Sequence, residues 1–221
     1  MKNIEKIEIA LLYLILISGG LWHILETFQY LMRLFAAPIL ITLAVLLFLK
    51  MKKVNDKQTK SFYVWSAVVF LGGYLFELIG VITGLVFGEY QYGTIFQPQL
   101  FNVPIAMGFA WLAIQIGSLG LAQRLVGGKW NRYALAITTA VLMVCFDLVM
   151  EQAAIYLDYW SWAAGAPPLH NYLGWFGISL LFSMLGAKLD LLSKPLPTFV
   201  YHSYVAQFIY FAMIYIKKVG L

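Results

Sequence analysis

Seven apolar stretches, each about as long as a membrane-spanning helix, are the feature that most limits what this chain can fold into. A helix needs roughly 17–25 mostly apolar residues to cross a bilayer. Period-2 alternation is nowhere long enough to indicate a β-barrel. The sequence therefore predicts an all-α integral membrane protein, a bundle of about seven transmembrane helices in a single domain, residues 1–221. The stretches are residues 7–28, 31–49, 62–87, 104–123, 133–157, 172–187 and 199–216.

The basic residues indicate how this bundle is oriented. With a cytoplasmic N-terminus, twelve of the 15 Lys and Arg residues fall in cytoplasmic segments. This positive-inside pattern predicts that orientation in a cell membrane, the inner or plasma membrane of a prokaryote. The net charge of +5 then reports topology and contact with the lipid bilayer, not a nucleic-acid partner. The twelve are Lys2, Lys6, Lys50, Lys52, Lys53, Lys57, Lys60, Arg124, Lys129, Arg132, Lys188 and Lys194, and the other three are Arg33, Lys217 and Lys218.

The first stretch also has features of a cleaved signal peptide, with two early Lys residues and small residues after its apolar run. However, the apolar run continues past Gly20, and Glu5 and Glu8 lie in what would be the basic region. We therefore expect a retained span.

Four acidic residues lie inside the predicted spans, where ionisable groups are costly: Glu26, Glu77, Asp147 and Glu151. An Asp costs at least about 2.5–3.5 kcal/mol on insertion scales. All four lie in the second halves of spans that run outward, and therefore at one depth toward the non-cytoplasmic face. A structural role, such as reaching the interface, suits Glu26 best. For the others we expect a polar cavity.

Two pairs of these groups share a helix face. Asp147 and Glu151 are four residues apart, and His23 and Glu26 are three apart. Two buried carboxylates so close cannot both ionise easily, so at least one is expected to hold a proton near neutrality. A carboxyl that holds its proton is what a general acid requires.

The two long loops on the far side resemble each other. In each, a Phe-acid-Leu motif is followed by an acid-Tyr pair and, thirteen residues later, by an Asn ahead of the next span. The pattern indicates a weak parallel internal repeat of the third and fourth spans in the fifth and sixth, with Glu77 and Asp147 facing each other. The matched residues are Glu77 with Asp147, Glu89 with Asp158, and Asn102 with Asn171.

These loops are also rich in aromatic residues. One explanation is an aromatic belt at the membrane interface. The other is that aromatic walls extend the cavity and guide an apolar substrate. The residues concerned are Tyr90, Tyr92, Trp160 and Trp162, with Trp111 and Trp175 early in their spans.

Several kinds of chemistry lack their sequence signals. The three His residues come from distant segments with no metal-ligand spacing, the single Cys145 excludes a Cys-based zinc site, and no phosphate-binding loop is present. We therefore expect no metal and no cofactor. Carboxylic acids with aromatic rings suit protonation of an isoprenoid double bond, because aromatic faces stabilise a carbocation.

Four stretches carry a resemblance to a known family: GLWHILETFQYLM at 20–32, FELIGVITGLVFGEYQYG at 76–93, NVP ahead of Trp111, and FDLVMEQ…YWSW…HNYLGWF at 146–176. They resemble the CruF-type membrane-integral carotenoid biosynthesis proteins, the carotenoid 1,2-hydratases. The chain departs from that family at Glu151-Gln152, where an Asp-Pro is common, and in a shorter loop after Trp162.

The resemblance implies addition of water across the carbon 1–carbon 2 double bond of an acyclic (ψ) carotenoid end group, with no metal, cofactor or oxygen. It places Glu77, Asp147 and Glu151 in the site. We expect Glu77 or Asp147 to protonate carbon 2 and Glu151 to activate water. The expected substrate-binding residues are His23, Glu26, Glu89, Tyr90, Tyr92, Asn102, Trp111, Asp158, Trp160, Trp162, Asn171 and Trp175.

Two other functions fit part of the pattern. A carotenoid cyclase shares the protonation step but captures the cation with an internal double bond. A proton-coupled transporter also uses buried acids, and the glycines of the third stretch suit its broken helices. A retinal photoreceptor is not expected, because the seventh stretch contains no Lys.

Overall fold

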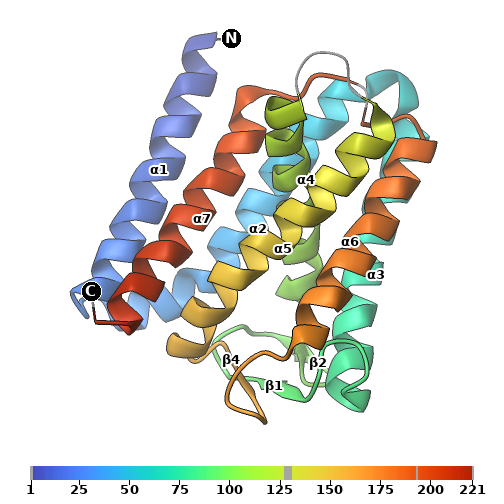
Figure 1. Ribbon diagram of the computed structural model, residues 1–221. Coiled ribbons are helices and arrows are strands. Elements are labelled where there is room, and N and C mark those ends of the chain that lie inside the picture. The colour runs from blue at the N-terminus through green and yellow to red at the C-terminus, as the bar shows by residue number, and fades with distance from the viewer. Residues whose placement is uncertain (1, 127–130, 193, 221) are drawn as a thin grey trace.

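The computed structural model describes residues 2–126, 131–192 and 194–220 as a bundle of long helices with short strands at one end (Figure 1). Lys129, which the charge pattern placed on the cytoplasmic side, lies outside the described residues. The helices are α1 (Lys2–Ile24), α2 (Gln29–Val54), the 3₁₀ turn η1 (Asp56–Gln58), α3 (Thr59–Thr83), α4 (Ala106–Val126), α5 (Arg132–Tyr156), α6 (Leu169–Lys188) and α7 (Thr198–Lys218). The strands are β1 (Tyr90–Tyr92), β2 (Gln99–Leu100), β3 (Val103–Pro104) and β4 (Trp160–Trp162).

Six of the helices in the described residues are long and apolar enough to cross a membrane. They are α1, α2, α3, α4, α5 and α7. The sixth predicted stretch forms α6, which has 20 residues but is not one of the six, since polar residues such as Asn171, Ser179 and Ser183 lower its hydropathy. These three polar side chains are buried against other helices, so the bundle itself shields them.

Helix α4 lies at the centre of the bundle. It packs against α2, α3, α5 and α7, and most of its residues are buried. Helix α1 is the least buried of the six apolar helices and packs mainly on α7 at the edge (Figure 1). The outer helices turn many large apolar side chains outward, which a lipid environment would cover.

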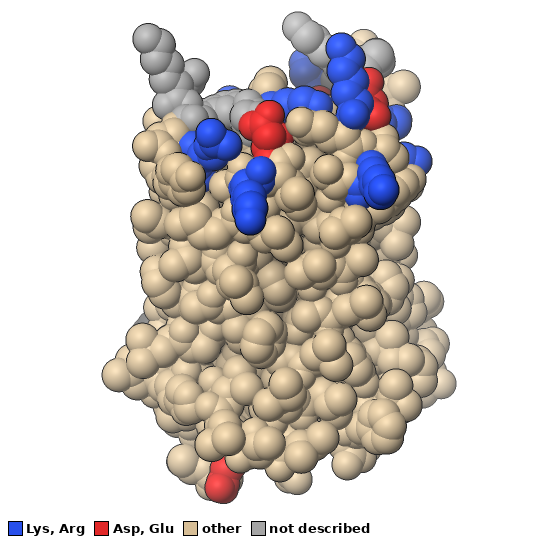
Figure 2. Space-filling view, turned by 90° about the vertical axis from the view of Figure 1, so that its right-hand side faces the viewer, with Lys and Arg blue, Asp and Glu red and all other residues tan. Residues whose placement is uncertain are grey.

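Charged residues are unevenly distributed along the bundle. Figure 2 shows Lys and Arg gathered at one end of the molecule, above a broad uncharged band. The N-terminus lies at this end, and the C-terminus lies toward the other end, where the strands are found (Figure 1). The strands and the carboxyl ends of α3 and α5 are therefore remote from most of the basic residues.

The first predicted span is shorter than expected at its carboxyl end. Helix α1 ends at Ile24, and residues 25–28 form a tight turn in which Glu26 and Phe28 have φ of 56° and 53°. The placement of Glu26 inside a span was therefore wrong. Its side chain is 60% exposed and lies 3.4 Å from Lys217 Nζ.

The third predicted span also ends early. Helix α3 ends at Thr83 because Gly84 adopts a left-handed conformation, φ 67°, and caps the helix with its N–H on Gly80 O. Phe87 therefore lies in the following loop, which continues into β1. Strand β1 pairs antiparallel with β4, joining the two aromatic loops, with Tyr90 opposite Trp162 and Tyr92 opposite Trp160.

Candidate active site

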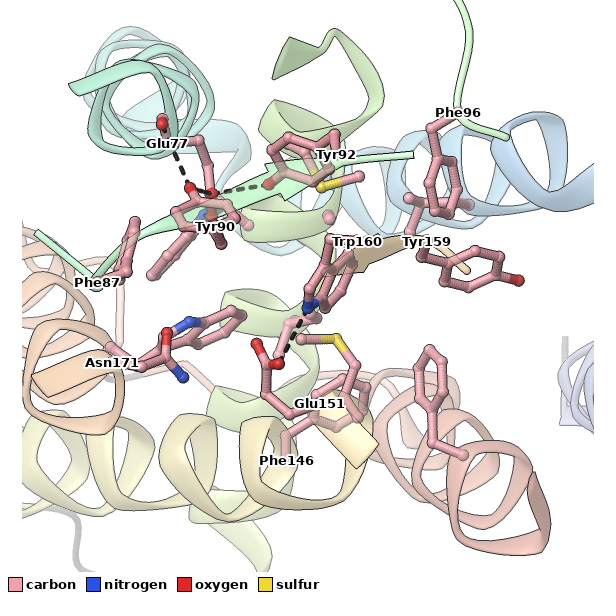
Figure 3. Close-up of a pocket in the computed structure, with 18 of the residues that line it drawn as sticks. Glu77, Phe87, Tyr90, Tyr92, Phe96, Phe146, Glu151, Tyr159, Trp160 and Asn171 are labelled. Atoms are coloured by element: carbon pink, nitrogen blue, oxygen red, sulfur yellow. Dashed lines mark hydrogen bonds between the residues drawn. The ribbon is translucent and has the colours of Figure 1, made fainter. Parts of the chain in front are cut away.

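An aromatic cavity of about 80 Å³ lies between the β1–β4 ribbon and the ends of the helices beside it (Figure 3). That volume exceeds the space a single water needs, about 10–15 Å³. Two carboxyl groups, Glu77 from α3 and Glu151 from α5, line it from different sides. Nine of the predicted site residues line it together: Glu77, Tyr90, Tyr92, Trp111, Glu151, Trp160, Trp162, Asn171 and Trp175.

Glu77 is held by three hydrogen bonds from aromatic side chains. The hydroxyls of Tyr90 and Tyr92 donate to Oε2 at 2.5 and 2.7 Å, and the indole N–H of Trp111 donates to Oε1 at 2.8 Å. All three of these partners are donors, and hydrogen bonds of this kind favour the ionised form of the carboxyl group. Burial, and then the carboxylate of Glu77, raise the pKa of both tyrosines, which therefore keep the protons they donate.

Two glycines on α3 make this arrangement possible. Gly73 and Gly80 lie one turn before and one turn after Glu77, on the same face of the helix. A Cβ on Gly73 would lie 2.5 Å from the side chain of Trp111, and one on Gly80 would lie 2.8 Å from Phe87 and 3.1 Å from the Tyr90 hydroxyl. The missing side chains therefore let the donors approach Glu77.

Glu151 is held by donors from the other loop. The indole N–H groups of Trp160 and Trp162 both donate to its Oε2, at 2.9 and 2.8 Å. These bonds leave Oε1 for a further partner. Each cavity carboxyl thus receives two hydrogen bonds from the strand that follows its own helix: β1 for Glu77 and β4 for Glu151.

Asp147 is completely buried but does not line the cavity. Its Oδ2 accepts a hydrogen bond of 2.6 Å from Asn171 Nδ2, and its Oδ1 has no hydrogen-bond partner among the residues that the structure describes. Asn171 itself does line the cavity. Asp147, which the loop pattern matched with Glu77, is therefore separated from the cavity by one side chain, and its catalytic role stays a prediction.

Stacked aromatic rings form much of the cavity wall. The rings of Trp111 and Trp175 stack with centroids 4.3 Å apart. Across the ribbon, Tyr90 and Trp162 lie 5.0 Å apart, and Tyr92 meets Trp160 edge-on at 5.9 Å. The loop aromatics thus pack inward on the carboxyl groups.

Five predicted binding residues lie elsewhere. Glu89, Asn102 and Asp158 are exposed, although the carbonyl of Glu89 extends the ribbon by accepting the Ala163 N–H. His23, Glu26 and Asp158 line a second, more polar pocket at the same end of the bundle. Of the residues that the loop spacing identifies, Glu89 thus contributes its main-chain carbonyl to the ribbon, and Asp158 lines the neighbouring pocket instead of the cavity.

Other lining residues are not evident from the sequence, because most of them are single apolar residues in apolar segments, which carry no signal. Tyr159 lines both the cavity and the polar pocket, while Gln207 of α7 is a buried amide on the cavity wall. An amide inside an apolar stretch is the one signal that could have identified Gln207. The remaining missed residues are Leu40, Phe87, Phe96, Met107, Ala110, Ile114, Phe146, Met150 and Phe211.

No group of three or more His, Cys, Asp or Glu side chains suited to a metal ion occurs among the residues that the structure describes. The expectation of a metal-free reaction stays a prediction. The cavity as it stands offers acidic groups, indole and phenol donors, and aromatic faces.

The fold and cavity define a helical membrane protein with buried carboxyl groups in an aromatic pocket. Residues 33–219 match the carotenoid biosynthesis protein family, and the chain belongs to that family. The chain is also similar to bisanhydrobacterioruberin hydratase of Haloarcula japonica, with 27% identity over 110 residues. That match covers 48% of this chain and 38% of the relative. No solved structure matches the chain.

Proposed function

We propose that this protein is a carotenoid hydratase that adds water to the terminal carbon 1–carbon 2 double bond of an acyclic carotenoid. The observation that carries the proposal is the pair of buried carboxyl groups, Glu77 and Glu151, in one aromatic cavity. The family assignment and the name of the Haloarcula relative support this reaction class. The same residues suit an apolar substrate that reacts through a cation.

The different surroundings of the two acids suggest their roles. Glu77 accepts three hydrogen bonds, which favours its ionised form, whereas Glu151 accepts two on one oxygen and keeps the other free for a substrate. We therefore propose Glu151 as the proton donor and Glu77 as the base. This reverses the role expected for Glu151 from the sequence.

The reaction balances without any other reagent. The Glu151 carboxyl proton forms a bond to carbon 2 with the electrons of the double bond, which leaves a tertiary cation at carbon 1. A water oxygen bonds to carbon 1, and Glu77 takes a proton from that water. The product is a tertiary alcohol, and a proton then returns from Glu77 to Glu151 through water.

The cavity wall would stabilise the cation between these steps. Trp160, Trp162, Trp111 and Trp175 present aromatic rings, and a cation over such a ring gains about 0.5–2 kcal/mol. The carboxylate of Glu77 is buried and adds direct charge stabilisation, which is stronger in a buried site than in water.

Pigment analysis in a bacterium that accumulates lycopene tests the proposal. The chain is expressed without oxygen, alongside an empty vector, and the carotenoids are analysed by mass spectrometry. The proposal expects a product heavier by one water per reacted end. An isomer of unchanged mass would indicate a cyclase, and unaltered lycopene beside well-expressed protein would contradict the proposed function.

A further inference from the structure

Three cavities in the described part of the chain lie in series between the carboxyl groups and the outer surface of the bundle. The aromatic cavity is the first. A middle pocket lies between α1, α2 and α7, and an apolar groove of about 500 Å³ runs between α1 and α2.

Each cavity shares lining residues with the next. The aromatic cavity and the middle pocket share five residues, and the middle pocket and the groove share four. The first five are Leu40, Phe96, Tyr159, Gln207 and Phe211, and the other four are Ile15, Leu16, Ile39 and Leu43. Because neighbouring cavities share these wall residues, the aromatic cavity adjoins the middle pocket, and the middle pocket adjoins the groove.

The groove is open on the outer side of the bundle. Leu11, Ile15 and Phe35 line it and are about half exposed, and α1 stands at the edge of the bundle (Figure 1). At its far end lie Lys50 and Glu8, which form an ion pair of 2.5 Å. A molecule in the groove would therefore reach it from the hydrocarbon of the bilayer, not from water.

We propose that this apolar path is the binding site for the polyene chain of the substrate, whose end group lies between Glu77 and Glu151. The proposal rests on the proposed function and adds to it how the substrate is held. The occupant is a long acyclic isoprenoid, because the path ends at the two acids and its lining from there to the ion pair is mostly apolar, with Gln207 and Thr42 as polar exceptions.

The dimensions of the path suit such a chain. Along α2 its lining residues run from Met32 to Lys50. At a rise of 1.5 Å per residue, the eighteen steps from Met32 to Lys50 measure about 27 Å, close to the roughly 30 Å of a bilayer core. A rod-shaped substrate could therefore lie along the helices with one end at the acids.

Blocking the path tests the proposal. Ile39 lines both the groove and the middle pocket, so Ile39→Trp narrows the junction between them without touching the acids. Leu34→Trp on the same helix is the matched control, because Leu34 is 54% exposed and lines none of the three cavities. Hydration is measured in lipid vesicles with a 40-carbon acyclic carotenoid and with a ten-carbon terpene that has the same end group.

We expect Ile39→Trp to lower hydration of the long substrate by about tenfold or more and to spare the short one, since only the long substrate loses binding contacts. Leu34→Trp should leave both rates unchanged. Equal rates for Ile39→Trp and the wild type on the long substrate, or an equal loss on both substrates, would overturn the path. Hydration of neither substrate by the wild-type protein would instead overturn the proposed function.

A binding measurement gives a second test that does not depend on turnover. A benzophenone amino acid replaces Ile39 or, as the control, Leu34, and the protein is irradiated in vesicles that contain the carotenoid. A carotenoid adduct at position 39 in excess over position 34 supports the proposal. Adducts with phospholipid acyl chains alone at position 39 would mean that the groove holds ordinary lipid.

Discussion

The surroundings of single carboxyl groups decide what each acid can do in this protein. Glu77 and Glu151 line one cavity, and aromatic donors from different segments fix both. Asp147 lies one helical turn from Glu151 yet is separated from the cavity by Asn171. Asp147 and Glu151 are only four residues apart on α5, yet Glu151 lines the cavity and Asp147 does not.

Amide substitution of the two cavity acids should abolish most of the activity. Glu77→Gln and Glu151→Gln keep the side-chain shape but remove the base and the proton donor, which contribute about 10²–10⁴-fold each. Glu26→Gln is the control, since Glu26 is exposed in the α1–α2 turn. Product formation per folded protein measures the effect, and full activity in either cavity variant would contradict the assignment.

Sequence reasoning identified these acids from the cost of placing charge in a span, but it could not identify their partners. Glu77 and Trp111 are 34 residues apart and meet only in the packed bundle. The exposed Glu26 shows the opposite error, because a turn with left-handed residues at Glu26 and Phe28 is not evident from hydropathy. Hydropathy reports how well a segment tolerates lipid, not which side chains converge.

The β1–β4 ribbon and α3 are the elements that position the cavity donors. The ribbon was not expected from the sequence, which indicated only two aromatic loops of similar pattern. Its close pairing requires Gly93, where a Cβ would lie 2.3 Å from Asp158 O. On α3, Gly73 plays the corresponding part for Trp111. The internal repeat stays a prediction, because Asp147 and Glu77 have different partners.

A methyl group at Gly73 should therefore damage the site. Gly73→Ala forces Trp111 away from α3, and overpacking of this kind costs about 1–3 kcal/mol. Gly177→Ala is the matched control, because a Cβ at that helical glycine meets nothing within 4 Å. We expect a lower thermal midpoint and reduced product formation for Gly73→Ala alone. Equal behaviour of the two variants would contradict the close packing of Trp111 on α3.

At the scale of the whole molecule, the separation of charge along the bundle fits a membrane protein with one basic end (Figure 2). The sequence predicted the number and approximate positions of the helices, since apolar length alone identifies them. It could not show that neighbouring helices bury Asn171, Ser179 and Ser183 of α6, a helix whose own hydropathy is below that of the other six. Burial by other helices is a property of the assembled bundle.

Cysteine labelling tests the proposed orientation in the cell membrane. In a Cys145→Ala background, Ser161→Cys marks the strand end of the bundle and Lys57→Cys marks the basic end, and both positions are exposed. If the basic end is cytoplasmic, a membrane-impermeant maleimide should label Ser161→Cys in intact cells and Lys57→Cys only after the membrane is broken. The reverse labelling pattern would show that the N-terminus is outside.

Isotope labelling of the added oxygen and hydrogen tests the central claim most directly, namely that the protein adds water to the terminal double bond. The purified protein is incubated in vesicles with an acyclic carotenoid, once in H₂¹⁸O and once in D₂O, and the product is analysed by mass spectrometry. Hydration through Glu151 and Glu77 predicts one ¹⁸O from water and one non-exchangeable deuterium at carbon 2 for each reacted end. A product whose oxygen does not come from water, or one that gains deuterium but no oxygen, would contradict it.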